Sequence, residues 1–299
     1  MMALRVRRKS HSLWSAEQDT TTPLQRTSAE SLLYQAAVTA LLSSNIEWLS
    51  GQTVWQQVEM YLSQIWDPAK SAGPKKAAPA PAPGVSLLLG IDPALCRLVR
   101  EISCLARRTP LQPADQSYAM AVRTELDLMI VKSTGDAQSG KRSPPSTAGR
   151  SEDEKHFWDA TKFYVCAADV LLRKTMHPHL TAEHAHIQAL VQQMLDILKQ
   201  SNIQGHFWSQ HYCWPFTILA CALLKEDDMV YLDLRLEEIW ENSHWGDVKR
   251  TLLVLRRISK ERYRGGTFRS HLTISNIGGP VAAFDLLLLK DGLSFLIES

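Results

Sequence analysis

Apolar residues recur every three to four positions along most of this chain, a spacing that places them on one face of an α-helix. The segment 28–50 opens with a capping-box pattern and continues with leucines and alanines at this spacing, which predicts a first helix. The residues after Gly51 predict a second helix. Its apolar face consists of Val54, Val58, Tyr61, Leu62 and Ile65.

Four further segments repeat the helical pattern, namely 92–108, 117–131, 154–174 and 181–200. The first of them starts with Asp92, an N-cap residue, and Pro93, which suits the first helical position. Only residues 270–277 alternate between apolar and polar side chains as a strand does, and only briefly. The sequence therefore predicts an all-α fold, a multi-helix bundle or helical array.

The stretch HYCWPFTILACALLKEDD, residues 211–228, holds the most apolar helix of the chain. Pro215 lacks an N–H and belongs in a first turn, so we expect a helix to begin near Trp214 and to be buried on every side. Asp227 or Asp228 is expected to cap the next helix. His211 and Cys213 precede the apolar run. A catalytic pair would also need an orienting group and an oxyanion donor, so a structural role is predicted for both residues.

Two low-complexity stretches interrupt the helical pattern. Residues 67–84 are rich in alanine and proline and predict an extended linker, whereas residues 133–154 have almost no apolar side chain to bury and predict disorder. They divide the chain into a basic, disordered N-terminal tail (1–27), an N-terminal helical segment (28–66), a linker (67–87) and a main helical domain (88–299) with a disordered insertion (133–154).

The composition of the chain argues against several classes of protein. The 299 residues carry a formal net charge of +2, which is not the charge of a protein that holds nucleic acid with its whole surface. The chain contains no uninterrupted run of 18 apolar residues, so the sequence predicts no membrane span. The N-terminal MMALRVRRKSHS has no apolar core behind its charges and does not look like a secretory signal. Five scattered cysteines favour reduced thiols inside the cell.

Several blocks of the chain carry a family resemblance. They are GIDPALCRLVREISCLARR, then YVCAADVLLRK with the helix after it, then WPFTILACALLKEDD, and finally YLDLRLEEIWENSHWGDVKRTLLVLRRISKERYRGG. Their order and spacing resemble the fungal-specific transcription factor domain over about residues 88–265, with the whole chain as the alternative extent. That domain is the C-terminal regulatory region of many zinc binuclear cluster regulators. The shared blocks are packing patterns rather than chemistry.

The resemblance implies a nuclear transcription regulator, with the cytoplasm as the alternative location. It implies protein partners, among them a DNA-binding transcription factor, a small-molecule effector, and control of a secondary-metabolite or nutrient-use gene cluster. The chain departs from the family in one respect, because no C-x₂-C pair of the six-cysteine DNA-binding module occurs in it. The basic cluster RVRRK (5–9) predicts at most weak phosphate contacts, so little sequence-specific DNA binding is expected of this chain alone. The alternative function is an enzyme or accessory protein of a biosynthetic pathway on a helical scaffold.

Three local patterns have a chemical and a structural interpretation. GDAQSGKR (135–142) resembles a phosphate-binding loop, but Pro144 and Pro145 prevent the helix that must follow it. HPHLTAEHAH (177–186) has four histidines without the i, i+4 spacing of a helical metal pair. Four tryptophans gather in one region and predict helix packing, with a ligand pocket as the alternative; they are Trp208, Trp214, Trp240 and Trp245. We therefore predict no catalytic, cofactor-binding or metal-ligating residue.

Overall fold

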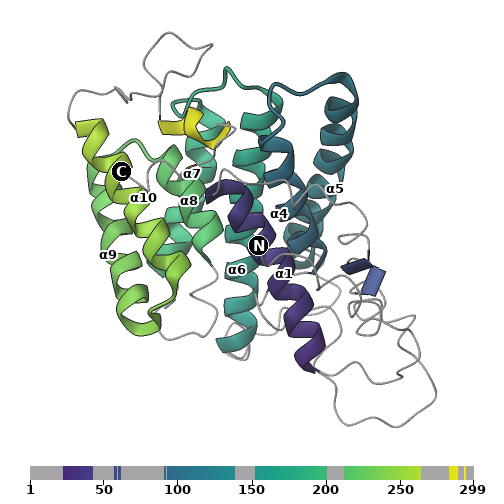
Figure 1. Ribbon diagram of the computed structural model, residues 1–299, viewed down its shortest axis with the longest axis horizontal. Helices are drawn as coiled ribbons and strands as arrows, with labels where there is room; N and C mark the ends of the chain where they lie inside the picture. The colour runs from purple at the N-terminus through teal and green to yellow at the C-terminus, as the bar shows by residue number, and fades with distance from the viewer. Residues whose placement is uncertain are drawn as a thin grey trace, which may run out of the picture.

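A computed structural model of the chain describes residues 23–42, 57–58, 60–61, 91, 93–138, 152–200, 212–263, 283–288 and 293. All longer elements in this part of the chain are helices, and none is a strand, which confirms the all-α prediction (Figure 1). They are α1 (Pro23–Leu42), α4 (Pro93–Ala106), α5 (Pro113–Gln138), α6 (Glu152–Met176), α7 (Ala185–Gln200), α8 (Cys213–Ala222), α9 (Glu226–Ser243), α10 (Gly246–Tyr263) and the 3₁₀ helix η5 (Ala283–Leu288).

Two helices, α6 and α8, organise the packing. α6 contacts α4 and α5 as well as α7 and α8, and α8 contacts α7, α10, η5 and α1. α5 lies at one edge of the molecule, and α9 lies at the opposite edge, where it packs mainly against α10 (Figure 1). The interior therefore lies around α4, α6 and α8, and the α9–α10 pair forms one side of the molecule.

Proline marks the start of three helices, because Pro23, Pro93 and Pro113 each occupy the first helical position. For α4 this confirms the prediction. α1 begins five residues before the predicted start at Ser28, so the capping-box pattern lies inside the helix instead of opening it. α7 begins at Ala185 rather than at 181, since residues 181–184 form a turn.

The buried helix predicted around Trp214 is confirmed. All ten residues of α8 are buried, and Pro215 lies in its first turn. The cap predicted for α9 is wrong: Lys225 is the N-cap and contributes no side-chain bond, while Glu226, Asp227 and Asp228 form the first turn. Three carboxylates are favourable there because the N-terminal end of a helix carries partial positive charge.

Several predicted segments lie partly or wholly outside the described residues. Of the helix predicted after Gly51, residues 57–58 and 60–61 are helical, with Val58 buried. Of the segment 133–154 predicted to be disordered, residues 133–138 are helical in α5 and residues 152–154 are helical in α6, and the residues between them are not among those described. The linker 67–87 and the alternating residues 270–277 are not among those described.

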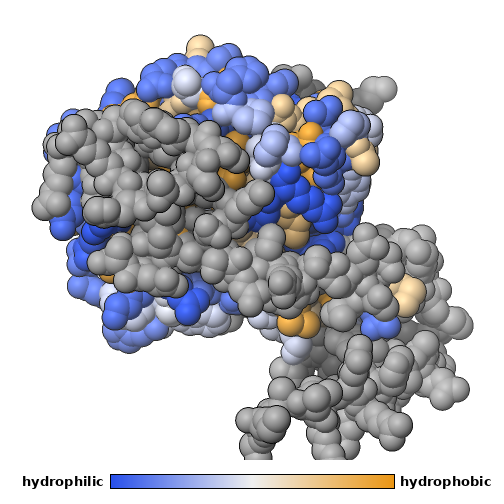
Figure 2. Space-filling view, turned by 45° about the horizontal axis from the view of Figure 1, so that its top comes forward, coloured by the Kyte–Doolittle hydropathy of each residue, from blue (hydrophilic) through white to orange (hydrophobic). Residues whose placement is uncertain are grey.

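On the face that Figure 2 shows, hydrophilic residues dominate and apolar residues occur in small separate patches. No helix in the described part of the chain is long and apolar enough to cross a membrane.

Candidate functional site

Cys213 and Trp214 lie in the interior, at the start of α8. The Trp214 indole N–H donates to Ser103 Oγ on α4 over 2.8 Å, and Ser103 Oγ donates in turn to the Val99 carbonyl over 2.7 Å. The indole also stacks on Tyr164 of α6, with ring centroids 6.0 Å apart and an interplanar angle of 3°. Trp214 thus joins three helices, and its polar atom is satisfied in the core.

The Cys213 thiol is 1% exposed, and burial, followed by the charge of Asp247, raises its pKa to about 12. It is therefore a protonated thiol at neutral pH, whereas a nucleophilic cysteine reacts as the thiolate. The prediction that Cys213 is a buried core residue is confirmed. His211 lies outside the described residues.

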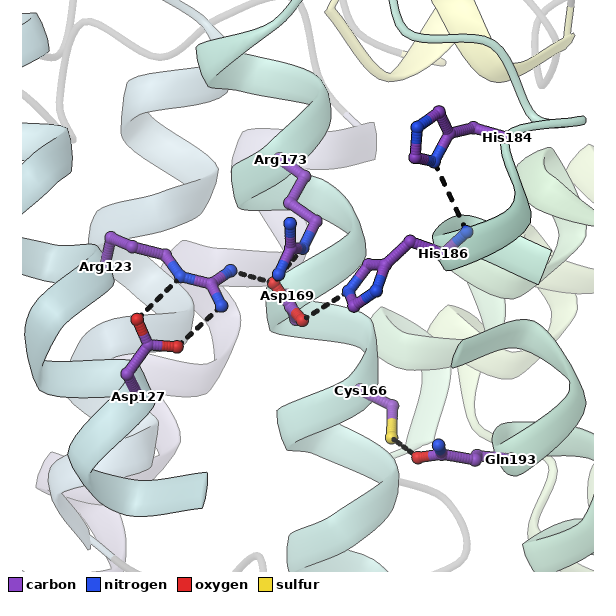
Figure 3. A network of polar contacts seen from close by, with 8 residues as sticks. All are labelled: Arg123, Asp127, Cys166, Asp169, Arg173, His184, His186 and Gln193. Atoms are coloured by element: carbon purple, nitrogen blue, oxygen red, sulfur yellow. Dashed lines mark hydrogen bonds and ion pairs between the residues drawn. The ribbon is translucent and has the colours of Figure 1, made fainter. Parts of the chain in front are cut away.

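A network of charged side chains joins α5, α6 and α7 around Asp169 (Figure 3). Asp169 is 2% exposed on α6 and accepts hydrogen bonds from Arg123 Nη1 and, over 2.7 Å, from Arg173 Nε. His186 Nε2 on α7 lies 3.4 Å from its second oxygen. Arg123 also makes a two-fold contact with Asp127, at 2.6 and 3.0 Å.

This Asp169 junction joins three helices through paired charges. Burial lowers the pKa of Arg123, but the Asp127 and Asp169 carboxylates outweigh it, and the net result is a raised pKa. A buried carboxylate is costly unless it is paired, and here two guanidinium groups supply the compensation. Both oxygens of Asp169 are engaged by these contacts.

The histidine-rich segment contributes His186 to this junction. His184 precedes α7, and its Nδ1 accepts the backbone N–H of His186 over 3.3 Å, which helps to satisfy the helix start. His177 and His179 lie in the connection from α6, with ring centroids 6.1 Å apart. Among the described residues, no three His, Cys, Asp or Glu side chains form a group that could hold a metal ion.

A buried lysine fixes the C-terminal part of the chain. Lys174 of α6 is 0% exposed, and its Nζ donates to the carbonyls of Pro178 and Leu180 at 2.6 and 2.7 Å and to Asp285 of η5. The same ammonium lies 5.1 Å from the centre of the Phe284 ring. All three donors of the ammonium are thus used, and η5 is held against α6 and α8.

The α9–α10 hairpin differs from these sites because all its described charged side chains except Asp247 are exposed or half-buried. α9 carries seven acidic residues and one arginine, whereas α10 carries six basic residues and two acidic ones. Arg256 of α10 bridges Asp233, at 2.8 and 3.2 Å, and Glu237, at 3.0 Å. Lys249 lies 5.5 Å from the Trp240 ring. The hairpin therefore has one acidic and one basic helix joined along their shared groove.

The other sequence candidates have mixed outcomes. Gly135 belongs to the last turn of α5, so the start of GDAQSGKR closes a helix instead of opening one, as a phosphate loop would. Of the four tryptophans, Trp214 is buried, Trp240 is half-buried and Trp245 is 38% exposed, so the region is not a single core. Trp208 lies outside the described residues.

The residues that the sequence analysis missed are Asp169, Arg123 and Lys174. A signal was present for Asp169, which interrupts the apolar run YVCAADVLL of α6. A lone charge in the middle of a buried helix requires a partner.

Comparison with protein families adds to this geometry. The model of the fungal specific transcription factor domain matches residues 20–266, well over half of the 299 residues. The chain belongs to this family. The match covers α1 through α10 and ends before η5. It extends the resemblance noted over residues 88–265 to include α1. Comparison with curated proteins and with solved structures gives no significant match.

Proposed function

We propose that the chain is a fungal transcription regulator that works in the nucleus through contacts with protein partners. Under this proposal a partner, rather than this chain, reads the DNA sequence at the promoter. The regulated genes would form a nutrient-use or secondary-metabolite cluster. A small-molecule effector between the helices would act by changing the affinity for the partner.

The family match over residues 20–266 is the observation that carries the proposal. The sequence supports the role of the partner, because it contains no C-x₂-C pair from which a zinc cluster could be built. The buried charges of Asp169 and Lys174 are engaged in joining helices. Specific readout needs an element placed in a groove with side chains that reach base edges.

A titration of the purified chain against promoter and random duplexes tests the partner requirement. At about physiological ionic strength, ~0.15 M, we expect weak binding that does not distinguish the two duplexes. Nanomolar binding with a strong preference for the promoter would overturn this part of the proposal.

Chromatin immunoprecipitation and gene deletion test the regulatory role itself. The tagged chain should be recovered at the promoters of a gene set whose expression changes together when its gene is deleted. A chain that associates with no promoter, and whose loss changes no transcript, would contradict the proposal.

A further inference from the structure

The outer face of the α9–α10 hairpin combines apolar residues with unpaired charges. Val230 and Leu234 are 53% and 56% exposed on α9, and Leu253 is 41% exposed on α10. Single exposed apolar residues are common on protein surfaces and would carry no inference alone. Here, however, each group lies among charges of one sign: acidic on α9 and basic on α10.

Helical spacing places these residues on one side of each helix. On α9 the residues Asp227, Val230, Leu234 and Glu241 recur at intervals of three, four and seven, and on α10 the residues Lys249, Leu253 and Lys260 recur at intervals of four and seven. The buried residues lie on the opposite side; they are Met229, Leu232, Leu236 and Ile239 of α9 and Val248, Leu252, Leu255 and Ile258 of α10. The hairpin therefore turns an acidic and a basic stripe outward, each with an apolar centre.

Some of these charges have no partner within the described part of the chain. Arg256, Asp233 and Glu237 neutralise one another along the groove between the helices. By contrast, Asp227 and Glu241 of α9 and Lys260 of α10 are exposed and form no ion pair with another described residue. The acidic stripe and the Lys260 end of the basic stripe are thus available to a partner of complementary pattern, while Lys249 also lies 5.5 Å from the Trp240 ring of its own copy.

We propose that this hairpin face is a docking surface for a second copy of the same chain. The face carries both signs of charge on parallel stripes, so it is complementary to itself. In a symmetric dimer the same surface is used on both copies, and residue pairs occur twice. The two hairpins together would form a four-helix arrangement with the apolar residues at its centre.

The charges select one of two possible symmetry axes. A two-fold axis perpendicular to the helices and lying in the interface would place α9 against the partner's α9, where like charges repel. An axis parallel to the helices places α9 of each copy against α10 of the other, antiparallel to it. Only the second arrangement brings the acidic stripe onto the basic one.

The register of this pairing follows from contacts within one copy. Arg256 is level with Asp233, and Lys249 is level with Trp240. An axis parallel to the helices preserves these levels between copies. Lys249 of one copy therefore meets Glu241 of the other, and Leu253 lies within a turn of Leu234.

At the outer end of the hairpin, Lys260 lies one helical turn beyond Arg256. The same symmetry places it beside the turn of the opposite α9 that carries Asp227 and Val230. Each copy thus contributes two complementary charge pairs, one at either end of the apolar centre. This pairing concerns the surface of the fold and does not depend on the proposed role in transcription.

A charge-exchange experiment tests the pairing. One variant carries Asp227→Lys and Glu241→Lys, and the other carries Lys249→Glu and Lys260→Glu. We expect the unaltered chain to be a dimer in sedimentation equilibrium and each variant alone to be a monomer, because like charges then face each other. An equimolar mixture of the two variants should recover the dimer mass, since opposite charges again meet at both contacts.

Two matched substitutions locate the surface. Leu234→Glu should dissociate the dimer, whereas Leu128→Glu on α5, at a residue that is 65% exposed, should leave its mass unchanged. Circular dichroism should show the same helix content for all variants, since every altered residue is exposed. An unaltered chain that is monomeric up to high micromolar concentration would overturn the proposal. Variants that stay dimeric, a mixture that stays monomeric, or dissociation by Leu128→Glu would do the same.

Discussion

α8 and α9 are consecutive helices separated by residues 223–225, yet they meet opposite environments. α8 is buried along its whole length, in contact with α6, α7, α10 and η5, whereas α9 packs mainly against α10 and exposes a charged stripe. The difference shows two ways of using a helix in one domain. Where neighbours lie on several sides, side chains are held by packing and by satisfied polar atoms; where a neighbour lies on one side, the rest of the helix is free to carry surface charge.

The largest expected difference between the two regions follows from placing a charge in each. Phe216→Asp puts an unpaired carboxylate into the core, where Phe216 packs edge-on against Phe163 with centroids 5.5 Å apart. It should lower the free energy of unfolding by about 3 to 5 kcal/mol. Leu234→Asp on α9 should change it by less than about 0.5 kcal/mol at dilute protein, because that side chain is already solvated. Urea unfolding measures both, and equal losses would contradict the contrast.

Removing a lysine should produce a smaller difference in the free energy of unfolding. The comparison is between Lys174, which is buried in the interior, and Lys199, which contacts α9. Lys174→Met keeps most of the apolar stem but leaves the Pro178 and Leu180 carbonyls without their donor, so we expect a loss of about 2 to 3 kcal/mol. Lys199→Met removes an exposed ion pair, 3.3 Å long, to Asp228 of α9 and should cost less than about 1 kcal/mol. Thermal unfolding of the two variants provides the comparison. If both lysines matter equally, Lys174 is not the anchor that its contacts indicate.

Removing a single hydroxyl group should produce a still smaller difference in the free energy of unfolding between the two regions. Ser103→Ala leaves the buried Trp214 N–H without an acceptor and should cost about 1 to 2 kcal/mol. Ser243→Ala, at the end of α9, removes a long exposed contact of 3.5 Å with the Trp245 amide and should be close to neutral. Ser103→Ala in a Trp214→Phe background serves as the control, since the N–H is then absent and the serine should contribute less.

The sequence predicted the regions unequally. The start of α8 could be placed within one residue because Pro215 is tolerated only in a first turn. For α9 the sequence predicted a helix capped by Asp227 or Asp228, but not that only the side with Met229, Leu232 and Leu236 would be buried.

The buried charges could not be assigned from the sequence. Asp169 is bound by Arg123, which lies 46 positions away, and Lys174 by Asp285, which lies 111 positions away. Such pairs depend on which helices become neighbours, and local periodicity contains no information on this. The start of α1 was placed too late for a different reason: a proline at the first position outweighed the capping-box pattern that follows it.

The smallest predicted effect is a loss of stability at alkaline pH to which two buried thiols of the interior contribute. Burial is the first cause that raises the pKa of Cys213 and of Cys166 from 9.0 to about 12. The folded state therefore keeps these protons at a pH where the unfolded state releases them. The stabilisation is fully present below about pH 9 and is lost as the pH rises from there toward 12, so going from pH 7.5 to 9.5 should cost on the order of 1 kcal/mol for each thiol.

The hairpin α9–α10 contains no cysteine, so no thiol of the hairpin contributes to this loss. The double variant Cys166→Ala and Cys213→Ala should therefore flatten the dependence of the unfolding free energy on pH, even though it lowers stability at every pH by removing buried sulfur. Urea unfolding at pH 7.5, 8.5 and 9.5 compares the two slopes. An undiminished slope in the double variant would mean that the alkaline loss comes from other groups, and that these two thiols do not distinguish the interior from the hairpin.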